Sequence, residues 1–423
     1  MTTPGERLSI AVVGGGISGL VAAWLLSREH DVHVFEADEH LGGHTLTRFV
    51  DDGGRQLPVD MGFIVHNDRA YPNFVRLMGE LGVERGESDM SFSVRCERTG
   101  LEWNGSSLNQ VFAQRRNLLR PSHYSMLLGI LRFHRLAPEV LASKDDTETL
   151  GEFLDRHRFS KPFVDYYLVP MAASVWSTEP RLVFEYPVRT LVTFLQNHGM
   201  LQVKGRPRWK YLPGGSKTYV EAIQRTWNAE LSLATPVDAI RRHSDGVEIR
   251  PRGGESRRFD HVVIATHSDQ ALQLLDDPTD AEREVLGAIR YQDNEVVLHT
   301  DPRFMPHRPL AWASWNAHIG THEGAEASPV QLTYYMNRLQ RIPSDTPYLV
   351  TLNRTAEIPE DKIIERRMMA HPLYTRGTVA AQKRWADVSC DRTWYCGAYW
   401  GWGFHEDGTV SGVRVADALG ARW

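Results

Sequence analysis

A glycine-rich turn close to the start of the chain constrains the fold more than any other feature. The apolar run Leu8–Val13 predicts a buried strand, and Ile17–Leu26 has the apolar spacing of a helix. The turn between them, residues 14–19, is spaced Gly-x-Gly-x-x-Gly, which lets the backbone approach a pyrophosphate at the amino end of the helix. Val32–Phe35 predicts a second strand. We therefore expect a β-α-β unit that binds an adenine dinucleotide.

Glu36 follows the second predicted strand, 17 residues after Gly19. A carboxylate at this place can accept hydrogen bonds from both hydroxyls of the adenosine ribose, and it would repel a 2′-phosphate. The sequence therefore disfavours NADP. The alternative, a glycine-rich turn beside a salt-bridged glutamate, leaves the agreement of strand, loop, helix and acid unexplained.

Two later turns favour FAD over NAD. Leu41–Thr45 reads Leu-Gly-Gly-His-Thr, and Val59–Phe63 reads Val-Asp-Met-Gly-Phe. With these turns the chain resembles the flavin-containing amine oxidase superfamily, which includes monoamine oxidases, protoporphyrinogen oxidases and phytoene desaturases. The resemblance implies a Gly-Gly-Arg turn after the ribose acid and an Asp-x-Gly turn beside the flavin. His44 replaces the arginine; a histidine can donate to a phosphate with less charge at neutral pH, and an ordinary loop histidine is the alternative.

Later segments extend the resemblance along the chain. Pro213–Gly215 resembles the family's Pro-x-Gly-Gly loop, Thr235–Val237 the strand edge that touches adenine, and Val262–Thr266 the strand that returns to the dinucleotide. Gly403–Gly412 resembles the stretch that opens the last helix, whose backbone amides point at N1 and O2 of the isoalloxazine. A helix amino terminus there stabilises negative charge on reduced flavin. Asp407 replaces a glycine of the family, and we expect it to cap this helix.

The resemblance implies a non-covalent FAD site formed by all of these segments. His405 and Glu406 would lie under the flavin ring, and Phe404 on its substrate side. Cys396 falls in a predicted buried strand and is expected to be an inert thiol, not a covalent tether. The complete predicted cofactor set is Gly14, Gly16, Ile17, Ser18, Gly19, Glu36, Ala37, Gly42, Gly43, His44, Met61, Gly62, Phe63, Val237, Ala265, Thr266, Phe404, His405, Glu406 and Gly408.

The chain of 423 residues is longer than one core usually holds. We expect an α/β fold, α+β overall, with a Rossmann-like FAD-binding domain (1–90, 211–290 and 386–423) interleaved with a substrate domain of mixed sheet plus helical insert (91–210 and 291–385). Further predicted elements are a strand over Val94–Trp103, helices between Ser107 and Phe194, a helix over Lys217–Trp227 capped by Ser216, strands over Leu231–Ile249, His261–Ala265, Val296–His299, Gln331–Tyr335 and Trp394–Ala398, and a last helix over Gly412–Leu419.

Composition argues against several kinds of partner. A net charge of −5 without a basic tail disfavours nucleic acid. The three cysteines stand in no metal-binding pattern, so we expect no metal site and a reducing, cytoplasmic location. We expect no signal peptide and no transmembrane helix. Leu127–Arg135 has an apolar and a cationic side, which fits peripheral contact with an anionic membrane, the lining of an acyl channel, or a core helix with solvated arginines.

The predicted activity is FAD-dependent oxidation of a hydrophobic substrate. We find no second Gly-x-Gly-x-x-Gly loop, so electrons would pass to oxygen or a carrier and not come from NAD(P)H. Phe404 stands where amine oxidases place a cage tyrosine, and phenylalanine attracts cations less well. A bacterial branch of predicted FAD-binding proteins associated with cyclopropane-fatty-acid-synthase-like methyltransferases is similar at Asp60–Asn67, Tyr71–Asn73, Gly397–Tyr399 and Gly403–Gly408. This resemblance implies an unsaturated or methyl-branched fatty acyl substrate that is desaturated or oxidised.

Three other functions stay open: an amine oxidase, a redox-neutral FAD-dependent fatty-acid double-bond isomerase, and a non-catalytic flavoprotein. Because the flavin carries out hydride chemistry itself, no acid–base pair is required. Each candidate for a direct role also fits an ordinary structural role. The candidates are Phe404, His405 and Lys217, with Lys210 and Lys204 as further lysines for flavin N5, and His123, His198 and His371 as bases.

Overall fold

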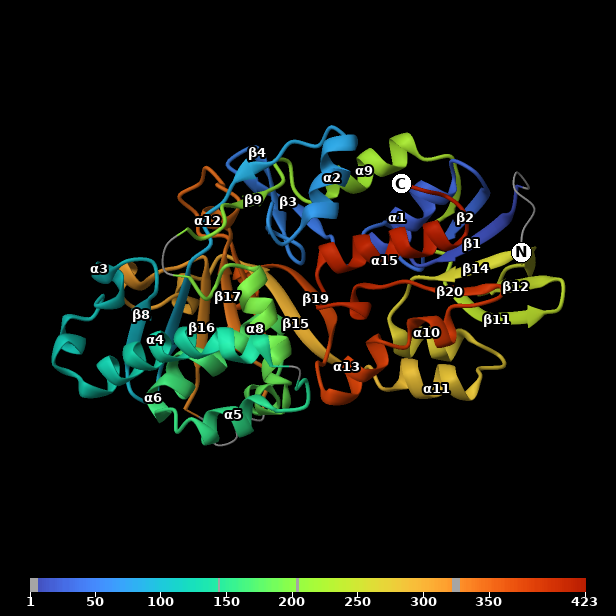
Figure 1. Ribbon diagram of the computed structural model, residues 1–423. Helices are drawn as coiled ribbons and strands as arrows, with labels where there is room; N and C mark the ends of the chain where they lie inside the picture. Colours follow the sequence, from blue (N-terminus) through green and yellow to red (C-terminus); the bar gives the residue numbers. More distant parts are fainter. Residues whose placement is uncertain (1–6, 144, 203–204, 322–327) are drawn as a thin grey trace.

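The computed structural model describes residues 7–143, 145–202, 205–321 and 328–423 (Figure 1). A five-stranded parallel sheet lies at one end of the molecule, with the strand order β10-β2-β1-β14-β20. This sheet confirms the predicted α/β class and the first predicted β-α-β unit. Its strands are β1 (Ser9–Val13), β2 (Asp31–Phe35), β10 (Ala229–Ser232), β14 (His261–Ile264) and β20 (Thr393–Tyr395).

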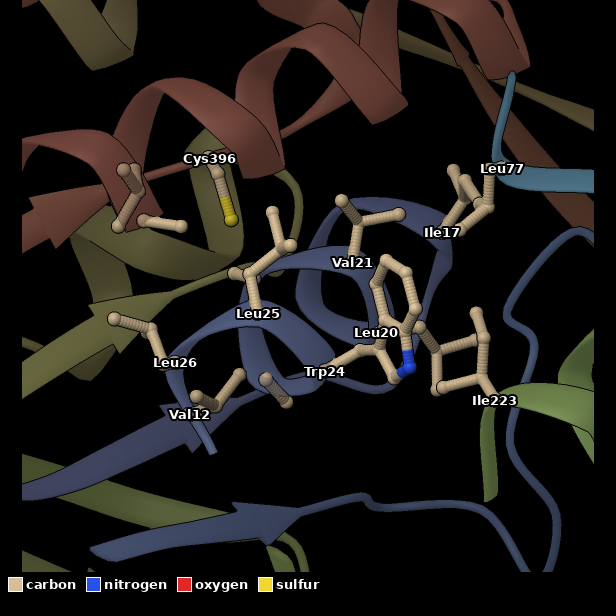
Figure 2. Packing of buried hydrophobic residues seen from close by; sticks show 14 of the residues in the cluster. Val12, Ile17, Leu20, Val21, Trp24, Leu25, Leu26, Leu77, Ile223 and Cys396 are labelled. Carbon is tan, nitrogen blue, oxygen red and sulfur yellow. The ribbon is translucent and has the colours of Figure 1, made fainter. Parts of the chain in front are cut away.

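Helices α1 (Ile17–Leu26) and α15 (His405–Ala418) cover one face of this sheet (Figures 1 and 2). Every residue of α1 is buried. Gly412 allows α15 to pack this closely, since a Cβ there would lie 2.6 Å from the carbonyl oxygen of Ser18. Cys396 lies in the same core (Figure 2), and burial raises the pKa of its thiol far above the usual value. The other face packs on α10 (Ser268–Leu274), α11 (Asp280–Gly287), β11 (Val237–His243), β12 (Gly246–Pro251) and β13 (Arg257–Phe259).

The second large sheet has seven strands, in the order β19-β15-β18-β17-β16-β7-β8. Neighbours are antiparallel except β16 and β7. The predicted single strand Val94–Trp103 is wrong, because the polar residues 97–100 form a turn that divides it into a hairpin. The strands are β7 (Phe92–Cys96), β8 (Leu101–Asn104), β15 (Tyr291–His299), β16 (Trp315–Ile319), β17 (Gln331–Tyr335), β18 (Leu349–Leu352) and β19 (Ile363–Pro372).

Helices from the middle of the chain pack on the β7, β8, β16 and β17 part of this sheet, which confirms the predicted helical insert (Figure 1). The longest is α4 (Pro121–Ala142). The shorter helices and turns of this region are α3 (Leu108–Val111), η1 (Arg115–Leu119), α5 (Leu150–Arg156), α6 (Lys161–Phe163), η2 (Val164–Leu168), α7 (Val169–Trp176), η3 (Pro180–Glu185) and α8 (Val188–Asn197).

The remaining small elements lie in the connections between the strands of the two large sheets. They are β3 (Thr47–Asp52), β4 (Arg55–Asp60), β5 (His66–Asn67), α2 (Pro72–Glu80), β6 (Gly86–Glu87), β9 (Trp209–Tyr211), α9 (Lys217–Thr226), α12 (Met336–Leu339), α13 (Arg376–Gln382) and α14 (Trp385–Val388). Short 3₁₀ turns are η4 (Pro302–Phe304), η5 (Pro309–Ala311), η7 (Thr355–Glu357), η8 (Glu360–Lys362) and η9 (Ala398–Trp400).

Two further predictions need correction. The predicted span Leu231–Ile249 is divided among three strands, because the chain turns after β10 and again between β11 and β12. The last helix begins at His405, seven residues before its predicted start, because the Asp407 carboxylate accepts the Phe404 N–H and caps it. The predicted cap by Asp407 is thereby confirmed. The domain boundaries stay predictions. Within the described residues no helix combines the length and apolarity needed to span a bilayer.

Candidate functional site

The glycine turn lies at the carboxyl end of β1, where strand order reverses. The chain leaves β1 for β2 on one side, and β14 adjoins β1 on the other. Such a reversal opens a crevice in parallel sheets. A Cβ on Gly19 would lie 2.0 Å from the Gly14 oxygen, so this glycine serves close helix packing. Nothing lies within 4 Å of the corresponding position on Gly16, so at this glycine the space is open to a ligand.

The start of α1 is suited to an anion. Gly16 occupies the N-cap position, and no described side chain caps the helix or places an acid in its first turn. The first amides of a helix lack intrahelical partners and carry partial positive charge. The open turn and the uncapped helix therefore fit the pyrophosphate of a dinucleotide, as predicted for Gly14–Gly19.

Glu36 is fixed beside this turn by two backbone amides. Its Oε2 accepts the N–H of Gly15 at 2.7 Å, and its Oε1 accepts the N–H of Asp38 at 2.9 Å. A carboxylate oxygen has a second lone pair, so both oxygens can still accept ribose hydroxyls. The edge leading to Val237 adjoins this acid, since the N–H of Thr235 donates to the Glu36 carbonyl at 2.8 Å. The exposed Ala37 follows Glu36 at the same edge.

The second glycine turn packs on the first. The Gly42 N–H donates to the Gly15 carbonyl at 2.8 Å, and a Cβ on Gly43 would lie 3.3 Å from Gly16 Cα. The next residue, His44, turns the other way: its Nε2–H donates to the Ala370 carbonyl at 3.1 Å. Burial and then His267 lower the pKa of His44 to about 4, so the ring is neutral and its Nδ1 carries no proton. The predicted donation from His44 to a phosphate does not fit this state of the ring.

Three histidine rings meet beside this turn. His267, after β14, and His371, near the end of β19, lie with ring centroids 5.7 and 5.3 Å from that of His44. Asn294 donates to His371 Nδ1 at 3.0 Å. Burial lowers the pKa of His267 to about 4 and that of His371 to about 3, so all three rings are neutral at pH 7. No group in the described part of the chain is arranged to hold a metal ion. The sequence indicated His44 and His371 separately and did not indicate His267, because no local pattern links these three positions.

The turn after β4 packs closely on the segment that contains His44 and Leu46. Gly62 allows close approach, since a Cβ there would lie 2.0 Å from the His44 carbonyl oxygen, which also accepts the Phe63 N–H. Met61 is buried and donates its N–H to the Leu46 carbonyl.

The acid of this turn, Asp60, accepts the backbone N–H and the hydroxyl of Ser216 at 2.9 and 2.8 Å. Gln340 donates to its other oxygen at 2.7 Å. Ser216 occupies the predicted N-cap position of α9, but its hydroxyl donates to Asp60 and makes no capping hydrogen bond within the helix. The contact joins β4 to the start of α9.

His405 faces the core. Its ring stacks on Phe63 with centroids 3.5 Å apart, and its Nε2 lies 2.9 Å from Thr45 Oγ1 and 3.1 Å from the Tyr219 hydroxyl. Burial, then His44 and His66, lower its pKa well below the usual value. A catalytic role for this side chain does not fit, because a stacked, neutral ring inside the core cannot reach a substrate. Only the backbone of His405 is free to meet a cofactor.

Glu406 is committed to another helix. Its Oε1 accepts the backbone and side-chain N–H groups of Asn73 at 3.1 and 2.6 Å, and its Oε2 accepts the Phe74 N–H at 2.9 Å. The carboxylate thus caps the start of α2, a role without any signal in the local sequence. If Glu406 contacts the cofactor as predicted, it does so through its backbone and not through its carboxylate. Gly408 allows α15 to pack closely on α1, since a Cβ there would lie 2.6 Å from Ile17 Cγ2.

Phe404 lies where two apolar cores meet. Its half-buried ring packs on Phe194 with centroids 5.1 Å apart and on His198 at 5.6 Å. It contacts both the core around α1 and the core of the helical insert. The half-exposed residues Ala265 and Thr266 follow the adjacent strand β14. Phe404 thus packs between the core around α1 and the helical insert, and its place on the substrate side of the flavin stays a prediction.

The remaining candidates are scattered. Lys217 pairs with Glu221 at 2.8 Å at the surface, and Lys210 lies 3.5 Å from Asp68. Lys204 lies outside the described residues. His123 lies in the helical insert, against Phe112. Of the candidate bases only His198 touches Phe404.

Together, the reversal of strand order, the open glycine turn and the fixed acid define a dinucleotide-binding protein. A model of the family described as "Flavin containing amine oxidoreductase" matches residues 17–369. The chain belongs to this family, and its cofactor is FAD. It is 26% identical over 306 residues to a protein of Mycobacterium tuberculosis named "Putative flavin-containing monoamine oxidase AofH". The match covers 68% of this chain and 63% of AofH, so the chain spans less than two thirds of this relative's length.

Solved structures share the fold at low identity. Cyclohexylamine oxidase from Brevibacterium oxydans is 16% identical with a TM-score of 0.69, covering 98% of this chain and 99% of that chain. The CLA-producing fatty acid isomerase from P. acnes is 14% identical, also with a TM-score of 0.69, covering 99% and 100%. An amine oxidase and a fatty acid isomerase fit equally well, so the fold does not decide the substrate.

Proposed function

We propose that this chain is an FAD-dependent oxidoreductase that removes a hydride from a hydrophobic substrate, an unsaturated or methyl-branched fatty acyl chain. The position of Phe404 carries the proposal. Its ring contacts the core around α1 on one side and the aromatic core of the helical insert, through Phe194, on the other. A substrate that approaches along Phe404 meets hydrocarbon and aromatic rings, and such surroundings favour an alkyl chain over a charged amine.

The described residues bind and orient, and FAD, when bound, supplies the hydride acceptor. The open turn at Gly16 and the first amides of α1 would hold the pyrophosphate, and Glu36 the ribose. We propose that the first amides of α15 meet the flavin ring, as the resemblance of Gly403–Gly412 to the family's last helix start implies. A covalent tether through Cys396 does not fit, because its sulfur lies inside the core against α1 (Figure 2). We therefore propose that FAD is bound non-covalently.

An amine oxidase is the second candidate, and the similarity to AofH favours it. A fatty-acid double-bond isomerase and a non-catalytic flavoprotein also stay open. We propose oxygen or a carrier as electron acceptor, a cytoplasmic location and peripheral contact with the inner membrane face, where acyl chains reside. The three cysteines of the chain are unpaired, which supports a reducing compartment.

Product analysis tests the proposal. The holoenzyme is incubated in air with phospholipids that carry unsaturated or methyl-branched chains, presented in detergent micelles. The masses of the fatty acids are then measured by mass spectrometry. A product with two hydrogen atoms fewer supports a desaturase. An unchanged mass with a moved double bond would assign the isomerase instead. Recovery of every lipid unaltered, with turnover of simple amines, would replace the proposal by the amine oxidase.

A further inference from the structure

Helix α3, η1 and the first half of α4 belong to the end of the molecule away from the five-stranded sheet (Figure 1). This segment carries several exposed apolar side chains. Leu119 is 88% exposed, Leu108 79% and Leu128 66%. Leu118, Tyr124 and Leu131 of the same segment are also exposed. We call the exposed side of residues 108–131 the leucine surface. Apolar groups collected in this way mark an interaction site more often than scattered ones do.

Helix α4 has two different faces, and both are explained by packing. Its inner face is buried through Met126, Phe133 and Ala137, and Gly129 lets Phe163 approach, since a Cβ there would lie 2.5 Å from the Phe163 Cβ. The outer face presents Tyr124, Leu128, Leu131 and Arg135, which follow helical spacing on one side. Because core packing accounts for the inner face alone, the leucines of the outer face require another explanation.

The charge of this segment is of one sign. Residues 103–138 contain five arginines and no aspartate or glutamate, in a chain whose net charge is −5. Arg115 and Arg116 are exposed and are held by the backbone carbonyls of Phe112 and Gly100. Arg135 is exposed on α4. Leucines among arginines of this density match the interface of an anionic bilayer, where leucine enters the acyl boundary and arginine binds phosphate.

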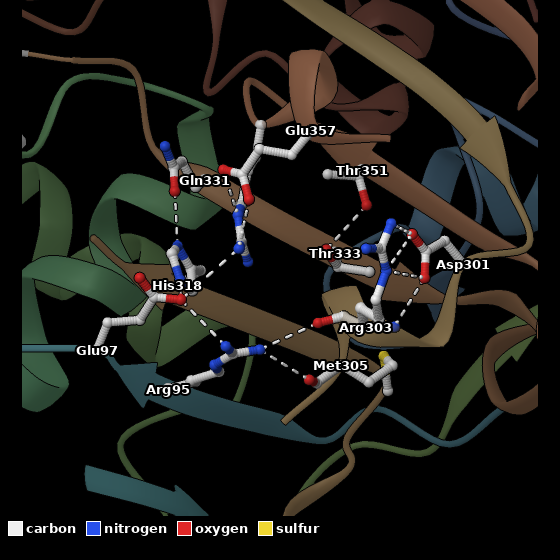
Figure 3. Close-up of polar contacts among 11 residues, drawn as sticks. Arg95, Glu97, Asp301, Arg303, Met305, His318, Gln331, Thr333, Thr351 and Glu357 are labelled. Atoms are coloured by element: carbon white, nitrogen blue, oxygen red, sulfur yellow. Dashed lines mark hydrogen bonds and ion pairs between the residues drawn. The ribbon is translucent and has the colours of Figure 1, made fainter. Parts of the chain in front are cut away.

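An open hollow of about 680 Å³ adjoins this segment, and Arg95, Arg115, Arg116 and Arg308 line it. Its two carboxylates are already engaged. Glu102 accepts the backbone amides of His307 and Arg308 at 2.8 and 3.0 Å. Glu97 lies 3.0 Å from Arg95 and 2.9 Å from His318 (Figure 3). Arg95 is itself paired with Glu97 and bonded to the carbonyls of Arg303 and Met305. The hollow therefore offers Arg115, Arg116 and Arg308 to an anionic headgroup, without free carboxylates opposing it.

We propose that the leucine surface docks this protein on an anionic phospholipid bilayer. The leucines enter the interface, and Arg115, Arg116, Arg120 and Arg135 meet the lipid phosphates. A second copy of the chain fits less well, because a two-fold contact through this surface would bring arginines against arginines. The inference rests on the proposed function in that an acyl substrate would reside in this bilayer. Docking itself requires no turnover.

The inner face of α4 connects this surface to the candidate site. Phe133 of α4, Phe194 of α8 and Phe404 at the start of α15 belong to one apolar cluster. The docking surface and the proposed substrate side lie on the same helical insert.

The test is flotation of the holoenzyme with vesicles of phosphatidylglycerol and phosphatidylcholine, with flavin absorbance reporting the bound fraction. The double variant Leu119→Ser/Leu128→Ser is expected to bind about 100-fold more weakly, at about tenfold for each leucine removed from the interface. Arg120→Gln/Arg135→Gln is expected to bind about 25-fold more weakly, at about fivefold per charge. The matched control is Ile364→Ser/Met368→Ser, two exposed apolar residues of β19, and it should bind like the wild type.

Three results would overturn the inference. One is equal flotation of the wild type and the leucine variant. Another is equal binding to vesicles of phosphatidylcholine alone. The third is a wild-type dimer in sedimentation that the leucine variant dissociates, which would assign the surface to a second copy. Since the lipids of the product assay are in micelles, loss of vesicle binding with retained lipid turnover separates failure of docking from failure of the proposed function.

Discussion

His405 and Phe63 stack with ring centroids 3.5 Å apart and ring planes 12° from parallel. The pair joins the turn after β4 to the start of α15, two segments that the sequence resemblance predicted to lie beside the flavin. Because His405 also bonds Thr45 and Tyr219, the whole arrangement is fixed before any ligand binds. The side chain acts as a positioning element, and the backbone around it is what a cofactor would meet.

Alanine substitutions at two glycines of the first turn should have different effects, one on FAD affinity and the other on the stability of the fold. Gly16→Ala places a methyl group in open space, so the protein should fold normally and bind FAD at least about tenfold more weakly, since the methyl group occupies the path of the pyrophosphate. Gly19→Ala places it 2.0 Å from the Gly14 oxygen and should lower the free energy of unfolding by about 1–3 kcal/mol. FAD titration and urea unfolding of the apoprotein measure the two effects. Reversed effects would contradict the account.

Glu36→Gln should weaken FAD binding by about 10- to 100-fold, because the charge-assisted bonds to ribose are lost. Quenching of flavin fluorescence during titration of the apoprotein gives the affinity. Glu39→Gln is the matched control, since this nearby glutamate is exposed. Equal affinities for the two variants would show that Glu36 does not contact the cofactor.

Glu406→Gln should lower the free energy of unfolding by about 1–3 kcal/mol, because the amides of Asn73 and Phe74 lose a charged acceptor. The visible spectrum of bound flavin should stay unchanged, since the carboxylate points to α2. Glu255→Gln, at an exposed position, is the control for urea unfolding. A changed spectrum with unchanged stability would place the carboxylate at the flavin.

The histidines His44, His267 and His371 should make the apoprotein sensitive to acid. Their folded pKa values, about 4, 4 and 3, lie below the ordinary value of 6.5, so between these limits the unfolded chain binds more protons. Stability present above pH 6.5 is therefore lost as the pH falls towards 4. His371→Gln should reduce the pH slope of the unfolding free energy, by up to about one proton, relative to wild type. The same slope in His371→Gln and in a variant at the exposed His307, His307→Gln, would contradict this assignment.

Sequence predicted the parts of the site whose signals are local. The turn at Gly14–Gly19 and the acid Glu36 lie within one β-α-β unit, so spacing alone indicated their arrangement. The bond from Glu406 to Asn73 spans 333 residues, and Ser216 serves Asp60 across 156. Such contacts depend on how helices and sheets pack, so the local sequence around each residue does not predict them.

Anaerobic titration of the bound flavin tests the central claim most directly. The holoenzyme is mixed in separate cuvettes with an unsaturated or methyl-branched phospholipid in micelles and with a simple amine, and the visible absorption of the flavin is followed. Bleaching by the lipid, without bleaching by the amine, is the predicted result. Bleaching by the amine alone would contradict the account and identify an amine oxidase.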